Sequence, residues 1–162
     1  MKVVIIAGAG EVGRGVAQAL IYERKNVILI DSDPDALKSA QSLECLLIAG
    51  DVMSRETLDH AGIQNAELLI MATDSDERNI LGCSFAKDHR QNMESVSGEM
   101  VTIARVNRML VAREDSSEVF HRWSQVEHVA NADKEIVDEL TAGLISPHIL
   151  HTCLLYTSPS PR

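Results

Sequence analysis

The chain has few aromatic and few basic residues, and both shortages narrow the functions open to it. Phe, Trp and Tyr make up 3% of its 162 residues, so it lacks the stacking platforms on which single-stranded nucleic acids bind. Its 15 Lys and Arg against 24 Asp and Glu give a net charge of −9, which argues against partnership with nucleic acid or an anionic membrane surface. No apolar run approaches the roughly 20 residues of a membrane span, so direct membrane insertion is not expected.

Cysteine is scarce as well. Cys45, Cys83 and Cys153 lie far apart without CxxC spacing, which favours a reduced, cytoplasmic setting and argues against a metal site. Met1 and Lys2 lead directly into an apolar run, so no signal peptide is predicted. Apolar residues make up 45% of the chain, enough for one globular domain with a substantial core.

The first 31 residues carry the pattern of a dinucleotide-binding unit. Two apolar runs, Val3–Ile6 and Val27–Ile30, are placed as strands on either side of a helical segment. The first run leads into the glycine turn Gly8-Ala9-Gly10-Glu11-Val12-Gly13, and the second ends on Asp31. This order of strand, glycine turn, helix, strand and acid predicts nucleotide binding, with the helix N-terminus facing the phosphates.

Each part of this pattern has a chemical role. Gly8 permits a tight turn, Gly10 lets the backbone approach a pyrophosphate, and Gly13 lets the helix pack close to the strand. Asp31 would accept hydrogen bonds from ribose hydroxyls. Plainer roles stay open: Asp31 can simply cap the next turn, and the glycines can serve packing in a fold that has lost its ligand.

Strands and helices alternate through the rest of the chain. The further predicted strands are Leu43–Ala49, Leu68–Met71, Val101–Arg105 and Val126–Ala130. Two further helices are predicted from their starts, one at Pro34 with Asp33 as its cap and one near Ser75. Three more are predicted over Ser54–Ala61, Arg108–Trp123 and Asp133–Ile145. Asp74 and Glu77 stand in capping-box spacing, Gly62 is predicted to be a left-handed cap, and Asp88–Glu99 is predicted to be an exposed loop.

This alternation predicts an α/β fold, a Rossmann-type doubly wound parallel sheet of about six strands in the order 3-2-1-4-5-6. The ligand crevice is expected at the switch between strands 1 and 4, where the glycine turn, Asp31, Gly50-Asp51 and Thr73-Asp74 would meet. Residues 147–162 form a tail, and from about residue 151 it looks like translated sequencing-adapter read-through. The domain is therefore assigned to residues 1–146, and the native protein is expected to continue further.

Several motifs together resemble one family. They are the glycine turn, the acid of LIDSDP, Ala49-Gly50-Asp51, the run ATDSDERN at Ala72–Asn79, and IARV at Ile103–Val106. In order and spacing the sequence resembles the N-terminal nucleotide-binding domain (RCK, KTN or TrkA-N) of Trk-type potassium uptake regulators. The resemblance covers nearly all of residues 1–146.

The resemblance implies a cytoplasmic regulatory subunit, peripheral to the membrane, that forms a homodimer or ring on a potassium transporter and gates it. NAD(H) is the most favoured ligand, with ADP or ATP as alternatives, because Glu11 stands where ATP-responsive members often carry an arginine. A C-terminal sensing domain would be missing, and Asp133–Ile145 matches a helix that crosses to the dimer partner. The implied cofactor-binding residues are Gly8, Ala9, Gly10, Glu11, Val12, Gly13, Asp31, Ser32, Gly50, Asp51, Val52, Ala72, Thr73, Asp74 and Arg105.

Other roles remain open for several of these residues. Asp51 can be a turn residue, Asp74 a helix cap, and Arg105 a partner of either carboxylate. No nucleophile elbow, Tyr–Lys relay or His–acid pair suggests a catalytic site, so an enzyme is not expected. The alternative is the cofactor-binding domain of a truncated NAD-dependent dehydrogenase, whose catalytic residues would lie on a missing part.

Overall fold

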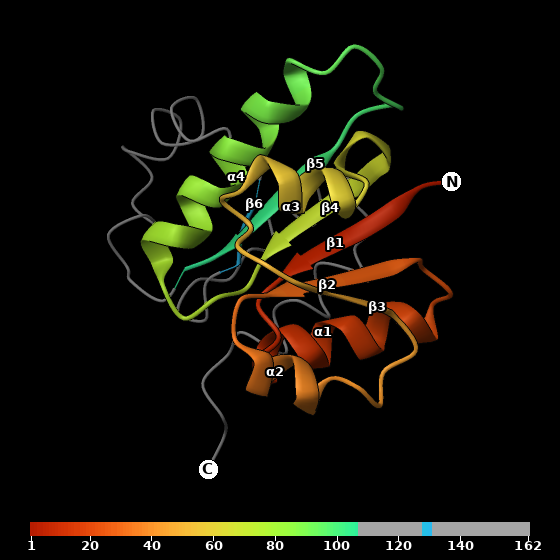
Figure 1. Ribbon diagram of the computed structural model, residues 1–162, viewed down its shortest axis with the longest axis vertical. Helices are drawn as coiled ribbons and strands as arrows, with labels where there is room; N and C mark the ends of the chain where they lie inside the picture. The colour runs from red at the N-terminus through yellow and green to blue at the C-terminus, as the bar shows by residue number, and fades with distance from the viewer. Residues whose placement is uncertain (107–127, 131–162) are drawn as a thin grey trace.

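The computed structural model describes residues 1–106 and 128–130 (Figure 1). The predicted helices 108–123 and 133–145 and the tail lie outside the described residues. The strands are β1 (Val3–Ala7), β2 (Val27–Asp31), β3 (Leu46–Ala49), β4 (Ala66–Met71), β5 (Val101–Arg105) and β6 (His128–Ala130). The helices are α1 (Glu11–Tyr22), α2 (Pro34–Ser39), α3 (Arg55–His60) and α4 (Asp76–Gln91), with a 3-10 turn η1 (Ile63–Asn65).

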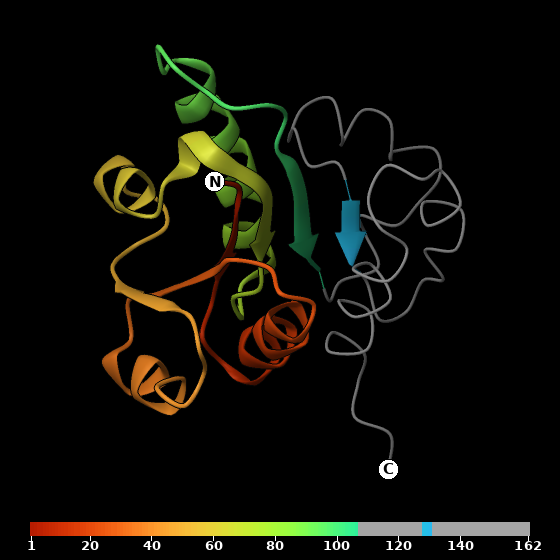
Figure 2. The same ribbon diagram turned by 90° about the vertical axis from the view of Figure 1, so that its right-hand side faces the viewer.

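The strands form one parallel sheet in the order β3-β2-β1-β4-β5-β6, which confirms the predicted topology. β1 lies at the centre and pairs with β2 through Val4↔Val27 and with β4 through Ile5↔Leu69. Figure 2 shows β6 beside β5, at the edge opposite to β3. The chain reverses direction across the sheet between β3 and β4, so a crevice opens beside β1 at the carboxyl ends of the strands.

Helices cover both faces of this sheet, which explains why its central strands are continuous apolar runs. On one face, Val4, Ile6 and Leu29 are buried against α1, with Val16 and Leu20 as its inward residues. On the other face, α3 and α4 cover a second cluster, which includes Ile5, Ile30, Leu58, Leu69, Met71 and Cys83. Side chains that alternate along β1 therefore anchor both cores, and this fixes the register of the strand at the crevice.

Helix α1 ends in a Schellman motif that has an arginine where glycine is usual. The Arg24 amide donates to the Ile21 carbonyl at 2.9 Å, and the Lys25 amide donates to the Leu20 carbonyl at 3.0 Å. Arg24 has a φ of 63°, in the left-handed region that costs non-glycine residues energy.

Arg24→Gly should therefore raise the free energy of unfolding by about 0.5–1 kcal/mol, because it relieves this strain. Urea denaturation measures the change. Arg24→Ala removes the same guanidinium but keeps the strain, so a gain in both variants would contradict the explanation.

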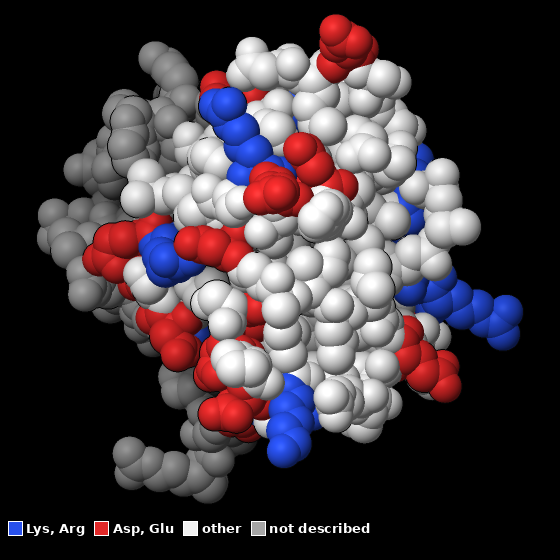
Figure 3. Space-filling model, viewed as in Figure 1, with Lys and Arg blue, Asp and Glu red and all other residues white. Residues whose placement is uncertain are grey.

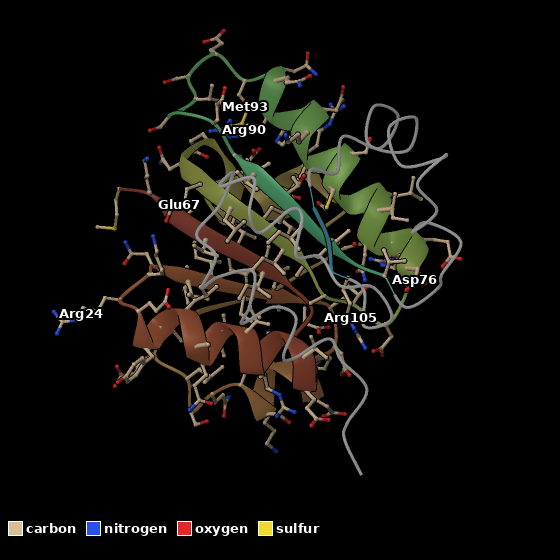
Figure 4. All side chains as sticks on the ribbon, turned by 180° about the vertical axis from the view of Figure 1, so that it is seen from behind. Arg24, Glu67, Asp76, Arg90, Met93 and Arg105 are labelled. Atoms are coloured by element: carbon tan, nitrogen blue, oxygen red, sulfur yellow. The ribbon has the colours of Figure 1, made fainter. Side chains whose placement is uncertain are left out.

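Helix α4 is longer than predicted, and the prediction of a loop from Asp88 is wrong for residues 88–91. Arg90 is the reason, because it is buried although its sequence neighbours are polar. Its guanidinium donates to the carbonyls of Ile63 at 3.1 Å, Ser97 at 2.9 Å and Gly98 at 2.8 Å. This burial lowers the pKa of Arg90. The side chain joins α4 to η1 and to the segment before β5 (Figure 4).

Three other predicted boundaries also shift. The fourth strand starts at Ala66 instead of Leu68. The third strand starts at Leu46 instead of Leu43, because the Leu43 amide donates to Ala40 and the Cys45 amide to Leu43 in turns. The cap of α4 is Ser75, whose hydroxyl accepts from the Arg78 amide at 3.2 Å, and the predicted cap Asp74 is wrong. The predicted Asp33 cap and the left-handed Gly62, with a φ of 74°, are confirmed.

Candidate functional site

A cleft of about 290 Å³ lies at the carboxyl ends of the central strands. That volume is close to the lower limit of about 300 Å³ for small-molecule sites. The turns after β1, β2, β3 and β4 supply its walls, as the topological switch requires. Its lining residues are Ala7, Gly8, Gly10, Ile30, Asp31, Ser32, Asp33, Ala36, Gly50, Asp51, Val52, Ala72, Thr73, Asp74 and Arg78.

The glycine turn is shaped by close approaches of backbone to backbone. Gly8 has a φ of 112°, and a Cβ there would lie 2.6 Å from the carbonyl oxygen of Ala72, which directly follows β4. A Cβ on Gly13 would lie 1.6 Å from the Gly8 carbonyl oxygen, so α1 can start this close to β1 only with glycine. Gly10 is the N-cap of α1 and has no side chain to cap the first turn, so the dipole end of α1 faces the cleft uncapped.

Asp31 holds the glycine turn in place. Its Oδ2 accepts from the Ala9 amide at 2.7 Å, and its Oδ1 accepts from the Asp33 amide at 2.8 Å. The second bond is the turn-capping role that the sequence left open, while the first joins β2 to the turn after β1. The side chain is half-buried and lines the cleft.

Backbone bonds just beyond the strands join these turns. The Gly8 amide donates to the Ile30 carbonyl at 2.8 Å, and the Gly50 amide donates to the Asp31 carbonyl at 3.0 Å. The Ala72 amide donates to the Ala7 carbonyl at 2.8 Å. These hydrogen bonds join the ends of β1, β2, β3 and β4 around the cleft without any contribution from a ligand.

Asn79 supports the turn between β4 and α4, a role that its place in the ATDSDERN motif did not predict. It is fully buried, and its Oδ1 accepts from the Thr73 amide at 2.9 Å and from the Thr73 hydroxyl at 2.6 Å. Its Nδ2 donates to the carbonyls of Thr73 at 3.0 Å and Arg105 at 2.7 Å. One amide side chain thus fixes the turn that carries Thr73 and Asp74 against the end of β5.

An ion pair crosses the cleft between residues of opposite halves of the sheet. The Arg78 Nη2 atom, from the first turn of α4, lies 2.6 Å from the Asp51 Oδ1 atom, which follows β3. Arg105 instead lies 3.9 Å from Asp74, and its Nη1 donates to the Thr73 carbonyl at 3.4 Å. Of the two carboxylates open to Arg105, the geometry selects Asp74.

Ten of the predicted site residues line the cleft, and five do not. Those in the lining are Gly8, Gly10, Asp31, Ser32, Gly50, Asp51, Val52, Ala72, Thr73 and Asp74. Those outside it are Ala9, Glu11, Val12, Gly13 and Arg105. Ala9 and Gly13 act on the shape of the turn, and Arg105 lies behind Thr73. Arg78 lines the cleft but is not among the predicted site residues. Its place in the first turn of a helix that starts at the cleft could have indicated that it lies there.

The electrostatic character of the cleft is acidic. Four aspartates line it, and Arg78 is the one Lys or Arg among its described lining residues. Figure 3 shows Asp and Glu gathered on the side of the molecule toward which the strands point in Figure 1, with few Lys and Arg among them. Within residues 1–106 and 128–130, no three or more His, Cys, Asp or Glu side chains are grouped so that they could hold a metal ion. None of the helices in these residues has the length and hydrophobicity of a membrane span.

A family model and several curated proteins are similar in sequence to this chain. A family model described as the TrkA-N domain matches residues 4–132. The Trk system potassium uptake protein trkA homolog 1 of Methanosarcina mazei is 43% identical over 107 residues, which are 66% of this chain and 25% of that protein. The Trk system potassium uptake protein TrkA of Haemophilus influenzae is 26% identical over 151 residues, 93% of this chain and 31% of that protein. The chain thus spans 25% to 31% of the length of these two relatives.

Solved structures with the same arrangement include the TrkA-N domain of the inner membrane protein ybaL from Escherichia coli. It aligns with a TM-score of 0.65 at 15% identity, over 88% of this chain and 96% of that one. A GsuK channel bound to NAD aligns with a TM-score of 0.60 at 18% identity, over 79% of this chain and 21% of that one. A GsuK bound to ADP aligns with a TM-score of 0.59 at 18% identity, over 79% and 30%. At these identities the likeness shows a shared fold.

Proposed function

Because this chain belongs to the TrkA-N domain family, we propose that it is the nucleotide-binding part of a regulatory subunit that gates a membrane potassium transporter. The observation that carries the proposal is the cleft itself, where a glycine turn, the uncapped start of α1 and Asp31 meet. This is the combination that holds a pyrophosphate and a ribose in dinucleotide-binding folds.

The chain's own residues suit an adenine dinucleotide. Gly10 leaves space above the turn, because a Cβ there would meet nothing within 4 Å, so a pyrophosphate can approach the backbone. Asp31 can accept from the ribose hydroxyls, and Asp51 and Val52, which line the cleft, would lie near the adenine. Thr73 and Asp74 would lie near the phosphates or the second ribose, with Arg105 behind them.

NAD(H) is the ligand we favour, with ADP or ATP as alternatives. Glu11, the first residue of α1, adds negative charge beside the turn and is unfavourable to a nucleotide with extra phosphates. Fold relatives bound to NAD and to ADP support the ligand class.

The regulatory role would work through differential binding. A nucleotide that prefers one arrangement of the cleft turns shifts the population toward it, and a dimer or ring of subunits passes this preference to the transporter. In this proposal the chain is cytoplasmic, peripheral to the membrane and not an enzyme. The names of its curated relatives support the potassium transport system as partner.

Asp31→Ala provides the direct test of the nucleotide site. We expect it to raise the Kd for NADH at least about tenfold in calorimetric titration, because charge-assisted hydrogen bonds to the ribose are lost. Asp35→Ala is the matched control, since Asp35 is exposed in the first turn of α2 and outside the cleft lining. If wild-type chain binds none of NAD, NADH, ADP and ATP, the proposal is wrong.

The dehydrogenase alternative makes a different prediction. The full-length gene product would then transfer hydride between a nicotinamide cofactor and an alcohol or hydroxy acid. Absence of turnover with bound NADH, together with a potassium transporter gene beside the coding sequence, would favour the regulatory role.

A further inference from the structure

The four aspartates that line the cleft differ in how closely a cation neutralises them. Asp31 and Asp33 accept hydrogen bonds from backbone amides, which leave their net charge unchanged. Asp74 is exposed and lies 3.9 Å from Arg105. Asp51 alone among the four has a close cation, Arg78, at 2.6 Å. The lining therefore keeps an excess of negative charge that a phosphate-rich ligand must overcome.

The Asp51–Arg78 pair is placed where it can change that balance. Asp51 follows β3 and Arg78 lies in the first turn of α4, so the pair spans the crevice between the two halves of the sheet. The Oδ1 atom of Asp51 also accepts from the Met53 amide at 2.9 Å, which fixes the carboxylate in its turn. Both side chains are about half exposed, at 50% for Asp51 and 47% for Arg78, so Arg78 can leave Asp51 without leaving a buried charge unpaired.

We propose that the Asp51–Arg78 ion pair determines how much phosphate charge the cleft accepts, an inference that rests on the proposed nucleotide function. While Arg78 is engaged by Asp51, it neutralises a carboxylate and is unavailable to a phosphate. The cleft then favours NAD⁺, in which the nicotinamide cation offsets part of the pyrophosphate charge, over ADP. Without Asp51, the same guanidinium becomes a phosphate ligand and the order shifts toward ADP.

The size of the effect follows from Coulomb's law. ADP carries about two more negative charges than NAD⁺ near neutral pH. One arises because its terminal phosphate loses a second proton near that pH, and the other because ADP lacks the nicotinamide cation. One unit charge at about 8 Å in a water-like dielectric changes the relative affinity of two ligands that differ by two charges about fivefold. Direct contacts to the adenine and its ribose are shared by both ligands, so they cancel in the ratio of the two dissociation constants.

The test is calorimetric titration of the full chain with NAD⁺ and with ADP, at low salt and without Mg²⁺. We expect Asp51→Asn to lower the ratio of Kd for ADP to Kd for NAD⁺ about fivefold, and Arg78→Gln to raise it about fivefold. Both shifts should shrink at about 1 M salt, where the Debye length is about 3 Å. Opposite signs from two variants cannot come from general loss of stability.

Matched controls are available at the other end of the molecule. Glu67→Gln removes a carboxylate whose ion pair with Lys25, at 3.3 Å, is also partly exposed, and Arg24→Gln removes a guanidinium. Figure 4 shows Glu67 and Arg24 on the side away from Arg105 and Asp76, which mark the end that holds the cleft. We expect both controls to leave the ratio within about twofold.

The possible outcomes separate the two proposals. If wild type binds both nucleotides but Asp51→Asn and Arg78→Gln leave the ratio as the controls do, this inference is overturned and the nucleotide site stands. If both variants move the ratio in the same direction, the inference is also overturned. If wild type binds neither nucleotide, both proposals fail.

Discussion

Gly13→Ala is expected to lower the free energy of unfolding by at least about 3 kcal/mol, because the new methyl group has no space. Its Cβ would lie 1.6 Å from the Gly8 carbonyl oxygen, and the contacted atom is backbone, which cannot rotate away as a side chain can. Gly13 is buried in the first turn of α1, so relief requires α1 to move off the end of β1. Urea denaturation followed by circular dichroism measures this loss.

Gly10→Ala is the control for this prediction, with the same methyl group added three residues earlier. Its Cβ would meet nothing within 4 Å, and the extended backbone of Gly10 suits alanine, so we expect a stability change below about 1 kcal/mol. Its effect should fall on NADH affinity, since the methyl group occupies the approach of the pyrophosphate. Equal stability losses in the two variants would contradict the steric explanation.

Asn79→Ala should lower the free energy of unfolding by about 3 kcal/mol, again through a change at one buried residue. The amide makes four hydrogen bonds, three to Thr73 and one to the Arg105 carbonyl, and all four partners lose it at once. Alanine offers neither donor nor acceptor, so polar groups at the end of β4 and β5 are left without their partner.

Asn92→Ala is its control, since it removes the same side chain from the other end of α4. Asn92 is exposed, and its Nδ2 donates to the Asp88 carbonyl at 2.8 Å, a group that water can satisfy. We expect a change within about 0.5 kcal/mol. A similar loss in both variants would mean that the network around Thr73 contributes little beyond helix propensity. Hydrogen exchange at the Thr73 amide would show whether that turn has opened.

The sheet order and much of the cleft could be predicted because they depend on patterns within single elements. The apolar runs fix the central strands, and the glycine turn with Asp31 fixes the carboxyl end of β1 and β2. Local chemistry also sufficed for Asp33, which caps α2 with its Oδ1 2.9 Å from the Asp35 amide. It failed at α4, where Asp74 and Ser75 are adjacent and both residue types suit a cap, and the structure has Ser75 accepting from the Arg78 amide.

The remaining errors come from contacts between distant parts of the chain. The polar neighbours of Arg90 predict a loop. In the fold its guanidinium donates to carbonyl groups of η1 and of residues 97 and 98. The residues around Arg78 do not indicate that it pairs with Asp51, which lies 27 residues earlier in the chain. The two meet because the chain crosses the sheet between β3 and β4. Long polar side chains can reach several partners, so their pairing depends on the tertiary fold.

The bonds between the strand ends have a thermodynamic consequence for any occupant of the cleft. Gly8, Gly50 and Ala72 are already bonded to the strands beside them, and Asp31 already holds Ala9. The backbone around the cleft is thus preorganised, so ligand binding has to order little of it. The conformational entropy lost on binding should therefore come mainly from the ligand and from exposed side chains. The side chains of Arg78 and Asp74 are exposed enough to change rotamer when the cleft is occupied, whereas the Met53 amide holds the carboxylate of Asp51 in its turn.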